Sequence, residues 1–109
     1  MKYVKVAQTT ELQAGDKKKI KVGDKEILLT NIQDSYYAID NTCPHMGGSL
    51  YDGNLDGSHI VCPRHGSIFD VKTGKVVQSG KLFLLKVKVH DLQNYPVKIQ
   101  GTDLFIEIE

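Results

Sequence analysis

The stretch "NTCPHMGGSL" (residues 41–50) places a cysteine and a histidine one residue apart, with a proline between them and two glycines close behind. The stretch "VCPRHGSIFD" (residues 61–70) repeats the arrangement, with two residues between its cysteine and its histidine. Cys43 and Cys62 are the only two cysteines of the chain. Most of the functional information in the sequence therefore lies in these two stretches.

The paired residues form a candidate metal-ligand set, Cys43-x-His45 and Cys62-x-x-His65, with sixteen residues between the two boxes. Two thiolates and two imidazoles suit either a tetrahedral zinc or an iron–sulfur centre. Mixed zinc fingers group their cysteines on one arm and their histidines on the other. Here each arm carries both types, which favours a two-iron centre between the loops, with both cysteines on one iron and both histidines on the other.

The flanks of these stretches alternate between apolar and polar residues at the period of a β-strand. We expect strands at residues 3–7, 19–22, 26–32, 36–40, 84–90, 95–100 and 103–109. Turn signals lie at Gly23-Asp24, Asp34-Ser35 and Gly101-Thr102, as between the strands of hairpins. No amphipathic helix of useful length is visible, so the pattern predicts an all-β protein with antiparallel sheets.

The segment at residues 41–75 differs in character from its flanks. It holds six of the ten glycines, two of the three prolines and few bulky apolar residues. We expect that it cannot easily build a core of its own, and that a bound metal orders it instead. The pattern is that of a small subdomain inserted into a β scaffold.

Length and composition limit the function classes. The 109 residues suit one domain, and 40% hydrophobic with 25% charged residues is typical of a globular protein. A net charge of +1 argues against nucleic acid or an anionic membrane as a partner, and "KKKIK" (residues 17–21) is the one local excess of positive charge. No apolar run suits a membrane helix or a signal peptide, so the expected location is the cytoplasm, where a disulfide between the cysteines is disfavoured.

At "CPHMGG", "CPRHGSIFD" and the following Thr73-Gly74, the sequence resembles the Rieske [2Fe–2S] family. The resemblance implies a single Rieske domain over residues 1–109, with antiparallel sheets at about 1–40 and 76–109 and the cluster-binding subdomain at about 41–75. It implies one [2Fe–2S] cluster per chain. The implied ligands are Cys43, His45, Cys62 and His65.

Residues next to the ligands have expected supporting roles. Pro44 and Pro63 stiffen the two loops. Met46 is expected to pack over the cluster, and Arg64 to lie at its rim. Glycines allow the backbone to approach the cluster and direct N–H groups at its sulfurs, or serve as ordinary turn residues; they are Gly47, Gly48 and Gly66.

Two further positions bear on the reduction potential. Two imidazoles in place of two thiolates make the cluster less negative, so it accepts an electron more readily. The reduction potentials of the family accordingly lie at about −150 to +300 mV. High-potential respiratory members carry a serine and a tyrosine whose hydroxyls bond to cluster sulfurs; Ser67 matches the first, but Phe69 replaces the second. Gly48 and Arg64 stand where those members carry an additional disulfide. We therefore predict a low-to-intermediate potential.

The resemblance implies a soluble, monomeric one-electron carrier that takes electrons from a flavin-dependent reductase and passes them to a terminal oxygenase or similar acceptor. No catalytic motif is visible, so we do not expect an enzyme. A terminal oxygenase would need a mononuclear iron with two histidines and a carboxylate, and only His59 and His90 remain for it. The alternative is the small Rieske-like subunit of an assimilatory nitrite reductase, which shares the fold.

Overall fold

The computed structural model describes residues 2–43, 48–64, 66–78, 81–82, 85–86 and 90–108. Within these ranges the chain is built of short strands in antiparallel sheets, which confirms the predicted all-β class. The elements, in chain order, are β1 (Lys2–Gln8), the 3₁₀ helix η1 (Thr9–Glu11), β2 (Lys17–Val22), β3 (Lys25–Ile32), β4 (Ser35–Asp40), the 3₁₀ helix η2 (Leu50–Asp52), β5 (Asn54–Asp56), β6 (His59–Val61), β7 (Ile68–Asp70), β8 (Val76–Gln78), β9 (Lys81–Leu82), β10 (Leu85–Lys86), β11 (Asn94–Tyr95), β12 (Val97–Gln100) and β13 (Asp103–Ile108).

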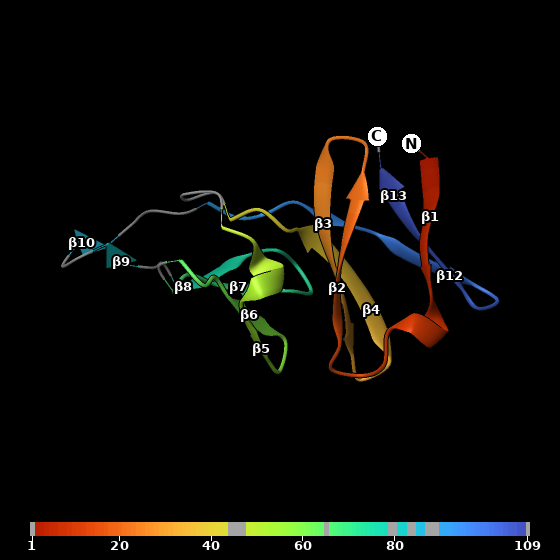
Figure 1. Ribbon diagram of the computed structural model, residues 1–109, viewed down its shortest axis with the longest axis horizontal. Coiled ribbons are helices and arrows are strands. Elements are labelled where there is room, and N and C mark those ends of the chain that lie inside the picture. Colours follow the sequence, from red (N-terminus) through yellow and green to blue (C-terminus); the bar gives the residue numbers. More distant parts are fainter. Residues whose placement is uncertain are drawn as a thin grey trace.

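The two ends of the chain form one sheet, with the strand order β1-β13-β12. β1 runs antiparallel to β13 from the pair Lys2↔Ile108 to the pair Gln8↔Asp103, with a register shift between Lys5 and Ala7. The N- and C-terminal strands therefore lie side by side (Figure 1).

The second sheet has the order β11-β4-β3-β2 and lies in the middle of the molecule (Figure 1). Successive residues of a strand point to opposite faces, and on β3 both faces are buried. Ile27 and Leu29 join a scaffold core with Leu104 and Ile106 of the terminal sheet. Leu28, between them, joins a second core on the opposite face. The middle sheet is thus covered on both sides.

The second core is here called the subdomain core. The sequence predicts that the segment at 41–75 cannot easily build a core of its own, and its fully buried residues Leu50, Ile60, Phe69 and Val71 share their core with the scaffold. The few apolar residues of the segment converge on one side. The scaffold supplies the remaining wall through residues that the local sequence does not reveal, namely Leu28, Ile39 and Leu92.

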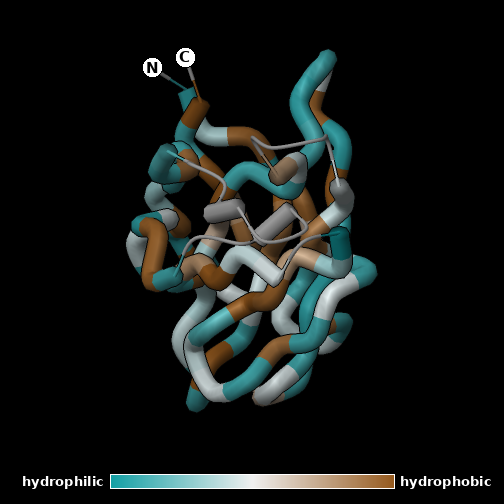
Figure 2. Tube along the Cα trace, turned by 90° about the vertical axis from the view of Figure 1, so that its left-hand side faces the viewer, coloured by the Kyte–Doolittle hydropathy of each residue, from teal (hydrophilic) through white to brown (hydrophobic). Residues whose placement is uncertain are grey.

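Residues 54–78 form a small sheet of order β5-β6-β7-β8, which lies beside the middle sheet (Figure 1). Each of these strands has three residues. Alternation cannot be recognised over so few residues, which is why the sequence pattern did not predict them. Figure 2, which views the molecule from the end where β9 and β10 lie, shows hydrophilic residues at the outlying turns and hydrophobic stretches toward the middle.

Two hairpin turns match their predictions and one is displaced by a residue. Gly23-Asp24 and Gly101-Thr102 connect strands as expected. The turn expected at Asp34-Ser35 lies at Gln33-Asp34, where both residues have positive φ. Asn31 explains the shift, because its Oδ1 accepts a hydrogen bond from the Asp34 N–H (2.8 Å) and holds the chain in that conformation.

The predicted strand at 84–90 falls mostly outside the described residues; within it, Leu85 and Lys86 pair with Leu82 and Lys81. The lysine run forms β2, at the edge of the middle sheet. Lysines on an edge strand discourage pairing with other chains. The described ranges contain no helix long and apolar enough to cross a membrane.

Candidate metal centre

The first and second cysteine loops (residues 42–49 and 61–68) begin and end in the same way. Thr42 pairs with Ser49, and Val61 pairs with Ile68, so each cysteine directly follows a cross-strand pair. The Cys43 N–H donates to the Gly48 carbonyl, and the Cys62 N–H donates to the Ser67 carbonyl, both at 2.7 Å. The two cysteines therefore occupy equivalent positions in two similar hairpin loops.

Both cysteine side chains are buried, each with 2% exposure, and both belong to the subdomain core. They are not joined in a disulfide. Thiols held together inside an apolar core are protected from bulk solvent and from external oxidants. This environment suits metal ligands better than it suits a surface nucleophile.

Gly48 is the point where the first loop approaches the second. A Cβ atom at Gly48 would lie 3.2 Å from the Sγ atom of Cys62 and 2.6 Å from the Cγ atom of Arg64. With the Arg64 stem in this position, only a residue without a side chain fits beside the Cys62 sulfur. The aliphatic part of the Arg64 side chain lies across Gly48, and Arg64 is otherwise exposed.

The remaining described residues near the cysteines are also located. Gly66 has φ +77° with open space around its Cβ position, so it serves the turn, and its N–H donates to the Cys62 carbonyl (3.1 Å). Ser67 is 1% exposed and Phe69 is fully buried in the subdomain core. Pro63 is exposed on the second loop.

The predicted ligands His45 and His65 lie outside the described residues, as do Pro44, Met46 and Gly47. Within the described ranges, no group of three or more histidine, cysteine, aspartate or glutamate side chains could hold a metal ion. The other two histidines, His59 and His90, are exposed. The four-ligand set therefore stays a prediction. The described half of it fits an iron–sulfur centre, because two buried thiols lie on two facing loops and a Cβ atom at Gly48 would lie 3.2 Å from one sulfur.

Asn41 is a residue of this site that sequence reasoning missed. It is fully buried, its Nδ2 donates to Ser49 Oγ (2.9 Å), and its Oδ1 accepts from the Tyr51 N–H (2.8 Å). The side chain thus joins the entry of the first cysteine loop to its exit. The sequence does show an asparagine directly before a loop, and an asparagine side chain in that position often forms hydrogen bonds with nearby backbone groups.

Tyr95 lies on β11, beside the strand that leads into the first loop. Its O–H donates to Asp40 Oδ1 at 2.5 Å, and the residue is 4% exposed. Burial, reinforced by the hydrogen bond to this carboxylate, raises the pKa of Tyr95 well above its usual range. The contact fastens β11 to the end of β4.

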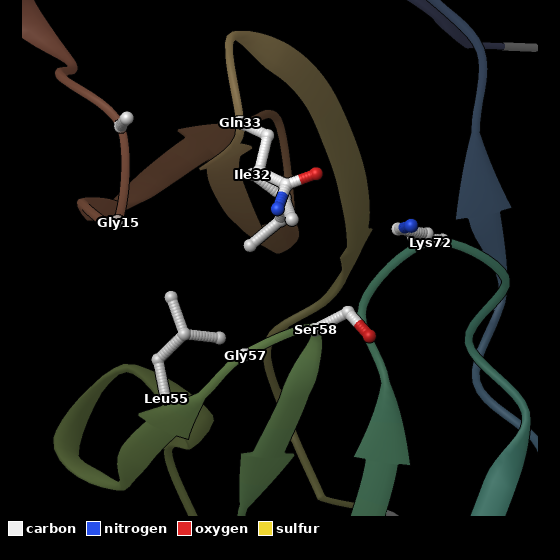
Figure 3. Close-up of a pocket in the computed structure, with 8 residues that line it drawn as sticks. Gly15, Ile32, Gln33, Leu55, Gly57, Ser58 and Lys72 are labelled. Carbon is white, nitrogen blue, oxygen red and sulfur yellow. The ribbon is translucent and has the colours of Figure 1, made fainter.

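A cavity of about 450 Å³ opens elsewhere, at the junction of the scaffold and the subdomain. Figure 3 shows Ile32 and Gln33 on the scaffold side, and Leu55, Ser58 and Lys72 on the subdomain side. Among the described residues that line this cavity there is neither of the two cysteines.

The family comparison agrees with this geometry. The model of the Rieske [2Fe-2S] domain matches residues 2–103. The chain belongs to the Rieske [2Fe–2S] family. Membership of this family supports an iron–sulfur cofactor.

Among Rieske proteins, the chain is 35% identical over 107 residues to the ferredoxin component of the naphthalene 1,2-dioxygenase/salicylate 5-hydroxylase systems of Ralstonia sp., covering 98% of this chain and 96% of that protein. The solved ferredoxin of carbazole 1,9a-dioxygenase from Nocardioides aromaticivorans IC177 superposes with a TM-score of 0.84 at 28% identity, over the whole of both chains. A complex of reduced oxygenase and oxidized ferredoxin in carbazole 1,9a-dioxygenase contains a chain with a TM-score of 0.83 at 28% identity, with 98% and 97% coverage. The similar proteins are thus small ferredoxins of about the same length.

Proposed function

We propose that this protein is a one-electron carrier of the Rieske type, which takes electrons from a flavin-dependent reductase and passes them to a terminal oxygenase. The observation that carries the proposal is the pair of buried cysteines at equivalent positions of two facing loops, in a chain of this family. The ferredoxin components of dioxygenase systems, to which the chain is similar over nearly its full length, support the role and both partners.

The proposed ligands are Cys43 and Cys62 on one iron, and His45 and His65 on the other. The bound cluster would supply the reversible uptake and release of one electron. The chain itself supplies the rest: the subdomain core keeps water from the thiols, Gly48 gives the first loop its close approach, and the Arg64 stem covers the contact between the loops.

We expect the reduction potential to lie in the low-to-intermediate part of the Rieske range of about −150 to +300 mV. The position where respiratory members carry a tyrosine is Phe69, and its side chain packs in the subdomain core with no hydroxyl to offer a sulfur. A voltammetric midpoint near the upper end of that range would contradict the expectation.

The test of the function is the absorption and electron paramagnetic resonance spectrum of the purified protein, with metal analysis. A red-brown protein with two irons per chain and a rhombic reduced signal of average g below 2 is expected. A colourless protein with stoichiometric zinc would refute the proposal. Turnover of a dioxygenase system reconstituted with and without this protein then tests the two partners, and association with a large sirohaem-containing subunit would favour the nitrite reductase alternative instead.

We also infer a cytoplasmic location and a monomeric carrier. Two cysteines without a disulfide suit a reducing compartment, and a small electron carrier must expose its redox centre to successive partners. Cell fractionation and the elution volume of the holoprotein in gel filtration test these two points.

A further inference from the structure

We infer that Asn41 is a positioning residue of the metal centre: its buried carboxamide sets the first cysteine loop at its distance from the second. This inference rests on the proposed function, because it assigns a role toward the cluster. It concerns a residue outside the two cysteine–histidine boxes.

Asn41 is 0% exposed, and its backbone and side-chain polar groups all have hydrogen-bond partners within the protein. Its backbone N–H donates to the Glu26 carbonyl (2.9 Å), and its own carbonyl accepts from the Leu50 N–H (2.9 Å). Its side chain bonds to Ser49 Oγ and to the Tyr51 N–H, at 2.9 and 2.8 Å. One residue thus connects β3 of the scaffold to three consecutive residues on the exit of the loop.

The contacts continue from Asn41 to the backbone of Cys43 and to the thiol of Cys62. Ser49, which Asn41 holds, is the neighbour of Gly48. The Gly48 carbonyl accepts the Cys43 N–H at 2.7 Å, and the Gly48 Cβ position is 3.2 Å from Cys62 Sγ. A displacement of Ser49 therefore changes the surroundings of both cysteines, because close-packed groups transmit small shifts.

The two loops differ in how their bases are held, and this difference gives the Asn41 side chain its role. The second loop continues into the β6–β7 ladder, with pairs His59↔Asp70, Ile60↔Phe69 and Val61↔Ile68. In the described part of the first loop, the only cross-strand pair is the isolated bridge Thr42↔Ser49. The hydrogen bonds of the Asn41 carboxamide hold the base of the first loop, whereas the β6–β7 ladder holds the base of the second.

A matched control exists in Asn31. It lies near the end of a strand, is 1% exposed, and uses both side-chain ends: Nδ2 donates to the Leu12 carbonyl (2.9 Å) and Oδ1 accepts from the Asp34 N–H (2.8 Å). Its bonds hold a scaffold hairpin and touch neither cysteine loop. Replacement by alanine removes one bond donated by Nδ2 and one backbone N–H bond accepted by Oδ1 at each site; the Nδ2 acceptor is a serine hydroxyl for Asn41 and a backbone carbonyl for Asn31.

The experiment compares Asn41→Ala with Asn31→Ala in the iron-loaded protein. We expect both to lower the thermal midpoint, since buried partners are left unsatisfied. Only Asn41→Ala should release iron to a chelator faster, on the order of tenfold, with faster hydrogen exchange in the peptide covering residues 42–51 and a shifted or broadened resonance spectrum. The inference would be overturned if both variants released iron at the same rate, or if Asn41→Ala released iron at the wild-type rate.

Ser49→Ala provides a second test if Asn41→Ala does not fold. It removes only the acceptor of the Nδ2 bond and should act in the same direction with a smaller fold-change; unchanged release and an unchanged spectrum would refute the inference. Asn41→Asp retains the acceptor for the Tyr51 N–H, and we expect it to lie between wild type and Asn41→Ala. A wild-type protein without iron refutes the proposed function itself, which separates that failure from the failure of the Asn41 assignment.

Discussion

At the scale of single residues, the contact between Gly48 and Arg64 decides how closely the cysteine loops approach. The ideal Cβ position of Gly48 is 3.5 Å from the Cβ of Arg64. A disulfide needs a Cβ···Cβ separation of about 3.5–4.5 Å. The backbone at positions 48 and 64 is therefore close enough for a disulfide. We predict from the resemblance that respiratory members of the family carry their additional disulfide at these positions, where this chain has Gly48 and Arg64.

We predict that the double substitution Gly48→Cys and Arg64→Cys forms a disulfide between the loops. Removal of the arginine stem frees the space that a side chain at position 48 needs. Closing a loop of this length should stabilise the protein against unfolding by about 3 kcal/mol. Mass spectrometry with and without reductant, and urea unfolding of both forms, measure the effect.

Arg64→Cys alone is the control, since Gly48 then offers no partner. Because the Gly48 Cβ position is also 3.2 Å from Cys62 Sγ, the competing product is a disulfide between the cysteine introduced at position 48 and the native Cys62. Detection of that product with loss of iron would contradict the prediction.

A second prediction at this scale concerns Tyr95 and alkaline pH. Burial, with the hydrogen bond to Asp40, raises the Tyr95 pKa in the folded state above the value of about 10 of an unfolded chain. The folded protein therefore keeps a proton that the unfolded chain loses, so stability falls as pH rises above about 10. Below that pH the contribution of this group is fully present.

Tyr95→Phe should remove this part of the pH dependence. The variant should also be less stable at neutral pH by about 1.5–3 kcal/mol, the contribution of a hydrogen bond to a charged group. Urea unfolding of both proteins from pH 7 to pH 11 gives the two curves. Parallel curves over the whole range would show that Tyr95 does not cause the alkaline loss.

At the scale of elements, the segment that carries both cysteine loops is joined to the returning scaffold chain at Gly74. The Gly74 N–H donates to the Asp70 carbonyl (2.7 Å), and its carbonyl accepts from the Leu92 N–H (2.8 Å). Its φ is +81°, and a Cβ there would lie 2.2 Å from the Leu92 carbonyl oxygen. Both the backbone conformation and the close approach require glycine.

We predict that Gly74→Ala lowers the free energy of unfolding by about 3 kcal/mol or more, because backbone strain and a backbone clash add. Gly57→Ala is the matched control: its φ is +60° and nothing lies within 4 Å of its Cβ position. It should cost about 1 kcal/mol, from the backbone alone. Equal losses in urea unfolding would argue against the clash at Leu92.

At the scale of the whole molecule, the middle sheet separates two cores. The scaffold core lies between this sheet and the terminal sheet, and the subdomain core lies on its other face (Figure 1). Cys43 and Cys62 belong only to the subdomain core. The cofactor should therefore stabilise one side of the molecule more than the other.

We predict that removal of iron accelerates hydrogen exchange in residues 41–75 while β1 and β13 keep their protection. The reason is that a metal fixes the loops that hold it, and the two described ligands of the proposed set, Cys43 and Cys62, belong to the subdomain core and not to the scaffold core. Hydrogen-exchange mass spectrometry of the loaded and the chelated protein tests the division between scaffold and subdomain. Equal loss of protection in the terminal strands would mean that the chain is a single cooperative unit.

The sequence by itself determined the features that depend on near neighbours. Strand alternation and turn residues are local signals, so β1 to β4 and β12 to β13 were predicted within a few residues, and the hairpin at Gln33-Asp34 within one. The spacing of Cys43 and Cys62 with their prolines and glycines likewise pointed to the family and to the metal centre.

The tertiary structure alone decided which neighbours a residue has across the fold. It assigned Leu28 and Leu29 to different cores, gave the sparse apolar residues of the subdomain a wall from the scaffold, and placed Gly74 against Leu92. It also brought Asn41 to the exit of the first cysteine loop. Such contacts join residues that are distant along the chain, and the period of a strand or the chemistry of a turn carries no information about them.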